Sequence, residues 1–433
     1  MHEFRWMAPL RVGFSSSPGI MDREPERYRA LWDRLAGRVE DRSWTIHRSS
    51  QTDTAPLGWS KADADLLPRP LQVVTGTIDP PTLPLCGDLE VTELSWSLYD
   101  HGVLLVEGSF RTAAHVDDAT LRDADHWEAA VQRAGEDLSR HCAEQEYAAL
   151  TEQLGRLADA EALLELEERE IGRPLWVTRS LAYDACASGA EDFARAWVSS
   201  IDAHHRDAVE ELIRGERPLV AQWMNHIYRP EMTEQVRLSW HALQKAQFFW
   251  SAMTWVDDSL RQILAWSMAD HGDVSVQALR NELRATMNQA QELLMLRADV
   301  RQHVSRRSHE EMQRFLGVWE YAELLESPVR EKVDICKERL TALAEDRAAR
   351  SAMFTDIILM SIGVTSVLAT AIALVQFGRD AGQDPSQSAF DLGNGSITSW
   401  LSSQSMDAIL VISILLSICL VGVFIWKRRQ SIS

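Results

Sequence analysis

The chain has 433 residues, a hydrophobic content of 45% and a formal net charge of -20 at pH 7. It is long enough for two domains, or for one large domain with an appendage, and apolar enough to bury a core. So acidic a chain repels the phosphate backbone, which excludes nucleic acid as an expected partner.

The front of the chain, residues 1–230, carries alternating signals for strands and helices. The clearest is a β-hairpin over residues 91–111, in which apolar and polar side chains alternate on either side of Asp100-His101-Gly102. Gly102 supplies the positive φ that a tight hairpin needs. Further strands are predicted at 10–14, 43–47, 71–76, 174–185 and 217–228, and helices at 24–39, 117–166 and 191–214. This order predicts an α+β cytoplasmic domain with a small mixed sheet.

Residues 231–350 are predicted to form a helical bundle and stalk. Apolar residues recur at helical spacing in 233–269 and again in 276–325. Pro328, with Ser327 as N-cap, is a good helix start. A short heptad seam then follows, formed by Val329, Val333, Cys336, Leu340 and Leu343. Two interpretations stay open, a stalk that couples the body to a membrane and an ordinary packed helix.

The last part, residues 351–433, predicts a two-helix transmembrane hairpin with a short basic tail. Residues 357–377 and 408–426 contain no charged side chain. Each run is long enough to cross a hydrocarbon core of ~30 Å. Basic residues precede the first run and follow the second, so both termini are expected in the cytoplasm. We therefore expect a protein of the bacterial inner (cytoplasmic) membrane, with the lipid bilayer as a partner.

The first predicted span carries small residues on one face. Ser361, Thr365, Ala369 and Ala373 repeat every four residues. Such a stripe allows close packing between membrane helices. The alternative is the polar lining of a pore, with Ser361, Thr365 and Gln376 facing water. One hairpin cannot enclose a pore, so the alternative requires a homo-oligomer.

Patterns for catalysis or for metal binding are weak in this sequence. Residues 11–19 have glycines after a predicted strand but lack both common phosphate-binding patterns. Asp202 and His205 share a predicted helix and could share a metal, but nothing fixes a third ligand. The cysteines are scattered without a Cys-x-x-Cys pair, which is typical of reduced cytosolic thiols. We expect a non-enzymatic protein with no catalytic residues, cofactor or metal site.

The layout resembles the CorA family of divalent-cation channels, which have an α+β cytoplasmic domain, a long stalk helix, two C-terminal membrane helices and a basic tail. The resemblance covers the topology of residues 233–433. That family carries a Gly-Met-Asn motif after its first membrane helix, whereas residues 373–383 read ALVQFGRDAGQ here. The resemblance implies a divalent-cation transporter of altered selectivity, with Gln376, Asp380 and Asp384 meeting the ion at the outer mouth.

A second resemblance is to the actinobacterial membrane proteins of caspase/TPR-repeat-associated (CATRA) conflict systems. It rests on TDIILMSIGVTSVLATAIALVQFGR at 355–379, and less clearly on PLWVTRSLAY at 174–183. It implies a defence component that answers a caspase-like or TPR protein partner. The resulting hypothesis is a membrane effector or signalling component that oligomerises through stalk and hairpin and perturbs or gates the membrane. A scaffold merely tethered by the hairpin is a third possibility.

Overall fold

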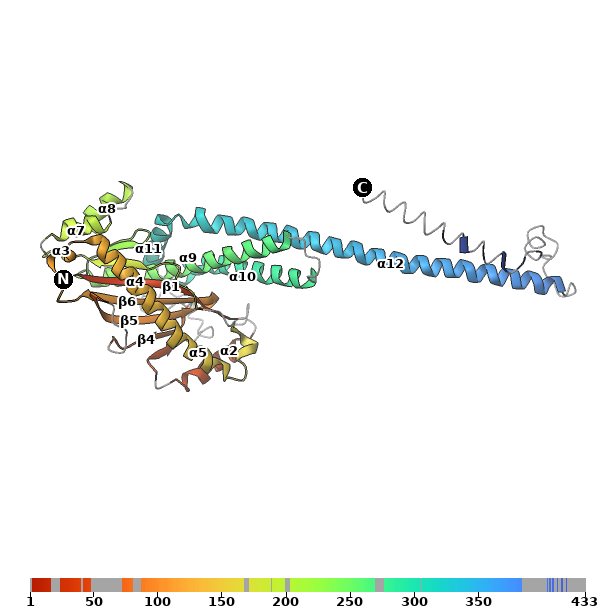
Figure 1. Cartoon of the computed structure of the whole chain (residues 1–433), viewed down its shortest axis with the longest axis horizontal. Coiled ribbons are helices and arrows are strands. Elements are labelled where there is room, and N and C mark those ends of the chain that lie inside the picture. The colour runs from red at the N-terminus through yellow and green to blue at the C-terminus, as the bar shows by residue number, and fades with distance from the viewer. Residues whose placement is uncertain are drawn as a thin grey trace. The chain divides into compact units, whose positions relative to one another are not determined.

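The structure is a computed structural model, and its elements are labelled in Figure 1. The chain divides into two compact units, Met1–Glu338 and Arg339–Ser433. The residues that the structure describes are 2–16, 24–39, 42–47, 72–80, 87–166, 171–187, 189–198, 203–268, 276–304, 306–383 and scattered positions between 403 and 418.

A mixed sheet of eight strands forms the centre of the first unit (Figure 1). The strands lie in the order β3-β4-β5-β6-β1-β8-β10-β9, and β8 and β10 are its parallel neighbours. The bounds are β1 Glu3–Arg11, β3 Trp44–Ile46, β4 Gln72–Thr77, β5 Leu89–Tyr99, β6 Val103–Thr112, β8 Thr178–Ala182, β9 Leu219–Val220 and β10 Asn225–Tyr228. A separate pair joins β2 (Phe14–Ser16) to β7 (Leu164–Leu166). The expected α+β class with a mixed sheet is confirmed, and the sheet is larger than expected.

Helices cover both faces of this sheet. On one face Trp127 of α4 stacks on Phe4 of β1, and on the other the Arg5 guanidinium lies over the Trp240 ring of α9. Successive residues of a strand point to opposite faces, so β1 is buried between two helical layers. The described α-helices that lie wholly within this unit are α2 Pro25–Ala36, α3 Asp118–Leu121, α4 Ala124–Cys142, α5 Ala148–Gly155, α6 Ala160–Leu163, α7 Ala190–Trp197, α8 Ala203–Ile213, α9 Thr233–Met268, α10 Val276–His303 and α11 Arg306–Val318.

The predicted hairpin is confirmed as β5 and β6, joined by a 3-10 turn at Asp100–Gly102. Gly102 has a φ of 74°, and His101 before it has a φ of 65°. A Cβ atom at Gly102 would also lie 2.7 Å from the carbonyl oxygen of Val12. Glycine is required here both for the left-handed backbone and for the close approach of the chain that leaves β1.

Several of the predicted boundaries are wrong, and the single strand predicted at 217–228 is two antiparallel strands, β9 and β10. The first strand is Glu3–Arg11 rather than 10–14, because a strand covered on both faces does not alternate apolar and polar residues. Ser327 is not an N-cap, since it has helical φ and ψ and directly follows a π-helical turn at Ala322–Glu326. Pro328 has no N–H, and its ring would clash with the carbonyl four residues earlier in a regular helix. The wider turn before it accommodates the proline.

Gly108 of β6 is predicted to be irreplaceable, because the backbone of β5 crowds it. A Cβ atom there would lie 2.6 Å from the carbonyl oxygen of Glu93 and 2.9 Å from Nε1 of Trp6. We expect Gly108→Ala to lower the free energy of unfolding by about 1–3 kcal/mol, because the strand itself must shift. Denaturant titration measures this, with Gly155→Ala as the control, since no atom lies within 4 Å of that added Cβ. Equal losses in the two variants would contradict the prediction.

The long helix α12 (Ser327–Gln383) spans 57 residues and contributes to both units. In the first unit Val329, Val333 and Cys336 are buried, as the heptad seam predicts for its first three positions. Burial raises the pKa of the Cys336 thiol to about 11, so this thiol stays protonated and unreactive at neutral pH. The first three positions of the heptad seam therefore pack within the first unit.

The second unit contains the first predicted span within α12. Four of its apolar side chains are exposed there, namely Ile358, Leu359, Ile362 and Val367. Among the helices that can be traced through described residues, none is at once long enough and apolar enough to cross a membrane. The second predicted span, 408–426, lies mostly outside the described residues. The hairpin thus stays a prediction.

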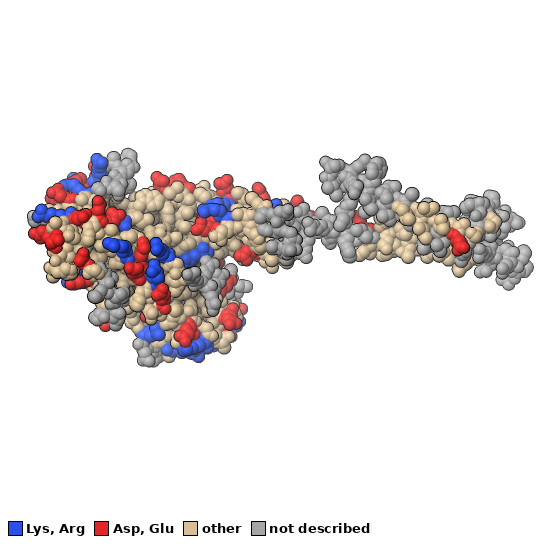
Figure 2. Space-filling view, in the orientation of Figure 1, with Lys and Arg blue, Asp and Glu red and all other residues tan. Residues whose placement is uncertain are grey.

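Charge is distributed differently in the described parts of the two units. Figure 2 shows acidic and basic side chains interspersed over the visible face of the first unit. The described residues of the second unit are almost all uncharged in the same view (Figure 2). Some of these neighbouring acidic and basic side chains form surface ion pairs, such as Arg195 with Glu210 at 2.9 Å. On the visible face, the acidic side chains of the first unit are thus mixed with basic ones rather than gathered in one patch (Figure 2).

Candidate binding site

The residues proposed from the sequence as pore-lining or helix-packing positions all lie on α12. Ser361, Thr365, Ala369, Ala373 and Gln376 are exposed. The Thr365 hydroxyl donates to the Ser361 carbonyl oxygen within the helix, so its polarity is already satisfied by its own backbone. The two outer-mouth candidates are not tested, because the side chain of Asp380 is not described and Asp384 lies outside the described residues.

A hollow with a volume of about 60 Å³ opens on the first unit, where four segments distant in sequence meet. Trp176 comes from the chain before β8, and Trp223 and Met224 from the loop between β9 and β10. Gln247 and Trp250 belong to α9, and Trp319 follows α11. Four of the six lining residues are tryptophans, which makes this a site for contact with aromatic faces and edges rather than for proton transfer.

Trp250 stands at the centre of these rings. The indoles of Trp176, Trp223 and Trp319 are inclined to it by 74°, 87° and 81°, with ring centroids 6.3, 5.5 and 5.9 Å away. Edge-to-face contacts in this range are the favoured geometry for aromatic pairs. Trp223 is nevertheless 46% exposed, so the ring cluster is open to solvent on that side.

Gln247 is the one hydrogen-bonding side chain without a ring in the hollow. Its Oε1 accepts from Nε1 of Trp176 at 2.6 Å. An indole nitrogen can only donate, which fixes the orientation of the amide. Gln247 is fully buried, and its Nε2 has no partner among the described residues. A buried donor without a partner costs about 1–3 kcal/mol.

The loop that carries Trp223 is held by backbone hydrogen bonds. The carbonyl oxygen of Met224 accepts from the backbone N–H of Arg179 at 2.7 Å. The carbonyl oxygen of Gln222 accepts twice, from Nε1 of Trp319 at 2.8 Å and from Nε2 of His226 at 3.1 Å. The wall of the hollow is thus tied directly to strands β8 and β10.

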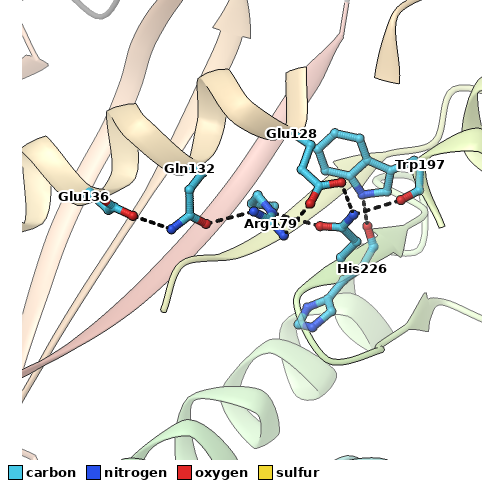
Figure 3. Close-up of polar contacts among 7 residues, drawn as sticks. Glu128, Gln132, Glu136, Arg179, Trp197 and His226 are labelled. Carbon is cyan, nitrogen blue, oxygen red and sulfur yellow. Dashed lines mark hydrogen bonds and ion pairs between the residues drawn. The ribbon is translucent and has the colours of Figure 1, made fainter. Parts of the chain in front are cut away.

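A buried polar network lies behind this loop (Figure 3). Arg179 of β8 forms an ion pair with Glu128 at 3.0 Å and donates to Gln132 and Asn225, each at 2.8 Å. Burial lowers the pKa of the Arg179 guanidinium, and the Glu128 carboxylate opposes that shift. Asn225 also donates to Glu128 at 2.9 Å, so α4, β8 and β10 are joined through one charged pair.

His226 completes this network from the other side of β10. It is fully buried, with Nδ1 3.3 Å from the Ser180 hydroxyl and Nε2 facing the Gln222 carbonyl oxygen. The carbonyl can only accept, so Nε2 carries the proton and Nδ1 accepts from Ser180. Burial, reinforced by the nearby Arg179 charge, lowers the pKa of His226 to about 4. The ring is therefore a neutral structural element at physiological pH.

The described residues contain no group of three or more potential metal-ligating side chains close enough to hold an ion. Asp202 lies outside those residues, as do the side chains of its neighbours His204 and His205. Comparisons with protein-family models, with curated proteins and with solved structures found no match to this chain. The functional reading therefore depends on the residues and their geometry.

Sequence reasoning did not identify the hollow or the Arg179 network. Trp176 and Arg179 both lie in the segment 174–183, but as single residues of a predicted strand they carry no ligand pattern. Trp223, Trp250 and Trp319 come from three further segments that only the fold brings together. The one available signal was the high tryptophan count of 16, which core packing also explains.

Proposed function

We propose that this chain is a membrane-attached binding protein without enzymatic activity, acting as an effector or signalling component of a bacterial conflict system. In this proposal the first unit receives a ligand or partner, and the C-terminal hairpin oligomerises to perturb or gate the membrane. A caspase-like or TPR protein is the partner that the CATRA resemblance implies.

The observation that carries the proposal is the composition of α12. One helix of 57 residues begins with side chains buried in the first unit and includes the uncharged run 357–377. A segment of that composition is typical of a membrane span. Basic residues on both sides of the predicted hairpin support cytoplasmic termini.

The hollow supports binding rather than catalysis. Its lining residues are indoles, a thioether and an amide, none of which titrates near neutral pH. The nearest buried histidine, His226, is held neutral behind the wall by its lowered pKa. These are groups that recognise shape and charge, and they suit a unit that receives a signal.

Membrane attachment can be tested by placing a charge at the centre of each predicted span. We expect the double variant Val367→Arg/Leu416→Arg to leave the membrane fraction after carbonate washing, whereas the unmodified chain stays there. Each buried arginine opposes insertion by about 2.5–3.5 kcal/mol. The control, Ser351→Arg/Ser431→Arg, adds the same charge outside both spans. Attachment would be refuted if the unmodified chain washed off, or if the central arginines changed nothing.

A second measurement separates the effector from the CorA-like alternative. The native mass of the detergent-solubilised chain tells whether a defined ring forms, which any pore requires. If a ring forms, divalent-cation uptake into liposomes identifies a transporter, and its absence favours the effector. A monomer or a simple dimer would leave the hairpin as an anchor and remove the pore from the proposal.

A further inference from the structure

We propose that the joint between α11 and α12 is a conformational switch that releases the start of α12 from the first unit. In the structure Glu320 interrupts the two helices, and in the second state it takes helical φ and ψ, so that α11 and α12 become one continuous helix. The switch rests on the proposed function for its purpose, because it gives the first unit a means to act on the stalk. Its residues all lie within Met1–Glu338, so its test is read separately from membrane attachment.

Glu320 is held in a backbone conformation that is unfavourable for its residue type. Its φ is 52°, in the left-handed region where the Cβ atom crowds the backbone. Helix α11 ends at Val318, and Tyr321 already has helical values, with φ -57° and ψ -39°. The Glu320 side chain is exposed, so its own packing does not impose this conformation. A single strained residue thus lies at the point where two helices would otherwise join.

The two aromatic neighbours of Glu320 hold it in place. Trp319 and Tyr321 are both buried, and the centroid of each ring lies 5.9 Å from that of Trp250. Nε1 of Trp319 also donates to the Gln222 carbonyl oxygen at 2.8 Å. Backbone strain persists where the surroundings fix a residue on both sides, and it is concentrated in switch regions and ligand clamps. Because Gln222 belongs to the loop between β9 and β10, a movement of that loop would loosen the joint.

The first unit covers the part of α12 that follows the joint. Val329, Val333 and Cys336, the first three positions of the heptad seam, are buried there. A heptad seam is the surface through which helices of separate chains pair in a coiled coil. While α12 is packed in this way, these positions are not available to a second copy. Straightening of the joint would expose them, and the stalk could then oligomerise.

An ion pair between α9 and α12 fits a contact that can open. Nζ of Lys332 on α12 donates to Oδ1 of Asp257 on α9, and the Asp257 side chain is only 9% exposed. A buried carboxylate that loses its only cation is strongly destabilising. Oδ2 of Asp257, however, also accepts from Arg261 of the same helix at 2.7 Å. Asp257 therefore keeps one cationic partner when α12 leaves, which lowers the cost of release.

The test is a pulsed electron paramagnetic resonance distance in the full-length, detergent-solubilised chain. Spin labels are placed at Arg306→Cys on α11 and Lys337→Cys on α12, both exposed, and the cysteines other than buried Cys142 and Cys336 are replaced by serine. One continuous helix would separate the labelled positions by about 46 Å, and any bend shortens this distance.

The variant that should populate the straight form is Trp319→Phe/Glu320→Ala. It loses the hydrogen bond to Gln222 and has a strong helix former at the joint. We expect only a shorter distance with the native joint and a second population near about 46 Å in this variant. Absence of the long distance from the folded variant would overturn the proposal.

Glycine at the joint gives the opposite result if Glu320 is the residue that moves. Glycine tolerates the left-handed backbone and disfavours the helix, so Trp319→Phe/Glu320→Gly should lower the ratio of long to short distances at least about tenfold relative to the alanine variant. Equal ratios would refute the role of Glu320. The same alanine and glycine comparison with Trp319 intact keeps the test independent of the tryptophan variant.

Trp240→Phe is the matched control for loss of an indole hydrogen bond. Nε1 of Trp240 donates to Oε2 of Glu107 at 2.8 Å, away from the joint, so this variant should show only the shorter distance. A long distance here would mean that general loosening, rather than the joint, produces the second population. Folding of each variant is checked by circular dichroism. We expect it to be retained, since the Gln222 carbonyl oxygen keeps His226 as a donor and Glu320 is exposed.

Discussion

Replacing Arg179 with methionine is expected to lower the free energy of unfolding by about 2–3 kcal/mol, because the buried Asn225 and the partly exposed Glu128 and Gln132 lose their donor together. The Arg179 side chain is only 8% exposed, and it serves Glu128, Gln132 and Asn225 within 3.0 Å. Methionine fills a similar volume, so the loss reports polar contacts rather than a cavity. Denaturant titration of the two chains measures it.

Two control variants make the Arg179 result specific. Arg133→Met removes an exposed arginine from α4, where its Nε reaches only the Ala129 carbonyl oxygen, and should change stability by less than ~0.5 kcal/mol. Glu128→Gln keeps an oxygen toward Arg179 and should lie between the two, since a buried cation then has only neutral partners. A loss in Arg179→Met no larger than in Arg133→Met would show that the network does not stabilise the fold.

Acidification is the second large effect that we expect. The pKa of His226 is 6.5 when unfolded and about 4 in the folded chain, so only the unfolded state takes up a proton between these values. Stability is therefore unaffected by this ring above pH 6.5, falls as the pH drops toward 4, and loses about 3 kcal/mol over that window. Burial also lowers the pKa of His2 and of His47, and both act in the same direction.

The contribution of His226 can be isolated with His226→Gln. Glutamine keeps a donor for the Gln222 carbonyl oxygen but does not titrate. Unfolding is measured at pH 7 and pH 4.5 for both chains, and the comparison uses the difference between the two pH values. We expect that difference to be smaller in the variant by most of the ~3 kcal/mol attributed to His226. Identical pH dependence in both chains would mean that the buried ring is not the titrating group.

Local sequence patterns predicted the helices and strands that have one buried face and one exposed face, because their apolar residues recur at a regular spacing. The hairpin of β5 and β6 has alternating residues around a glycine turn, and the structure has it at that place. The helix α9 was predicted from its apolar spacing and ends within one residue of its predicted bounds, 233–269. The α+β class followed from such elements.

The features that escaped prediction depend on tertiary contacts. The strand β1 lies under helices on both faces, which removes the alternation from its sequence. The hollow gathers residues as far apart as Trp176 and Trp319, and no spacing rule connects them. In the sequence Arg179 is an ordinary strand residue, and only the fold shows that it forms an ion pair with Glu128 of α4. The candidate site could therefore be identified only from the three-dimensional structure, whereas the fold class could be predicted from the sequence.

Pro9 of β1 limits the pairing of this strand with its neighbour β8. The ladder between β1 and β8 runs from Phe4 to Met7 and then stops, although the same register would bring Ala8 opposite Val177 and then Pro9 opposite Trp176. Proline has no N–H to offer a neighbouring strand. Instead, the Leu175 N–H bonds to the Pro9 carbonyl oxygen, one residue out of step. Trp176 therefore lies just before β8 rather than within it, and from there its ring reaches Gln247 and Trp250 of α9.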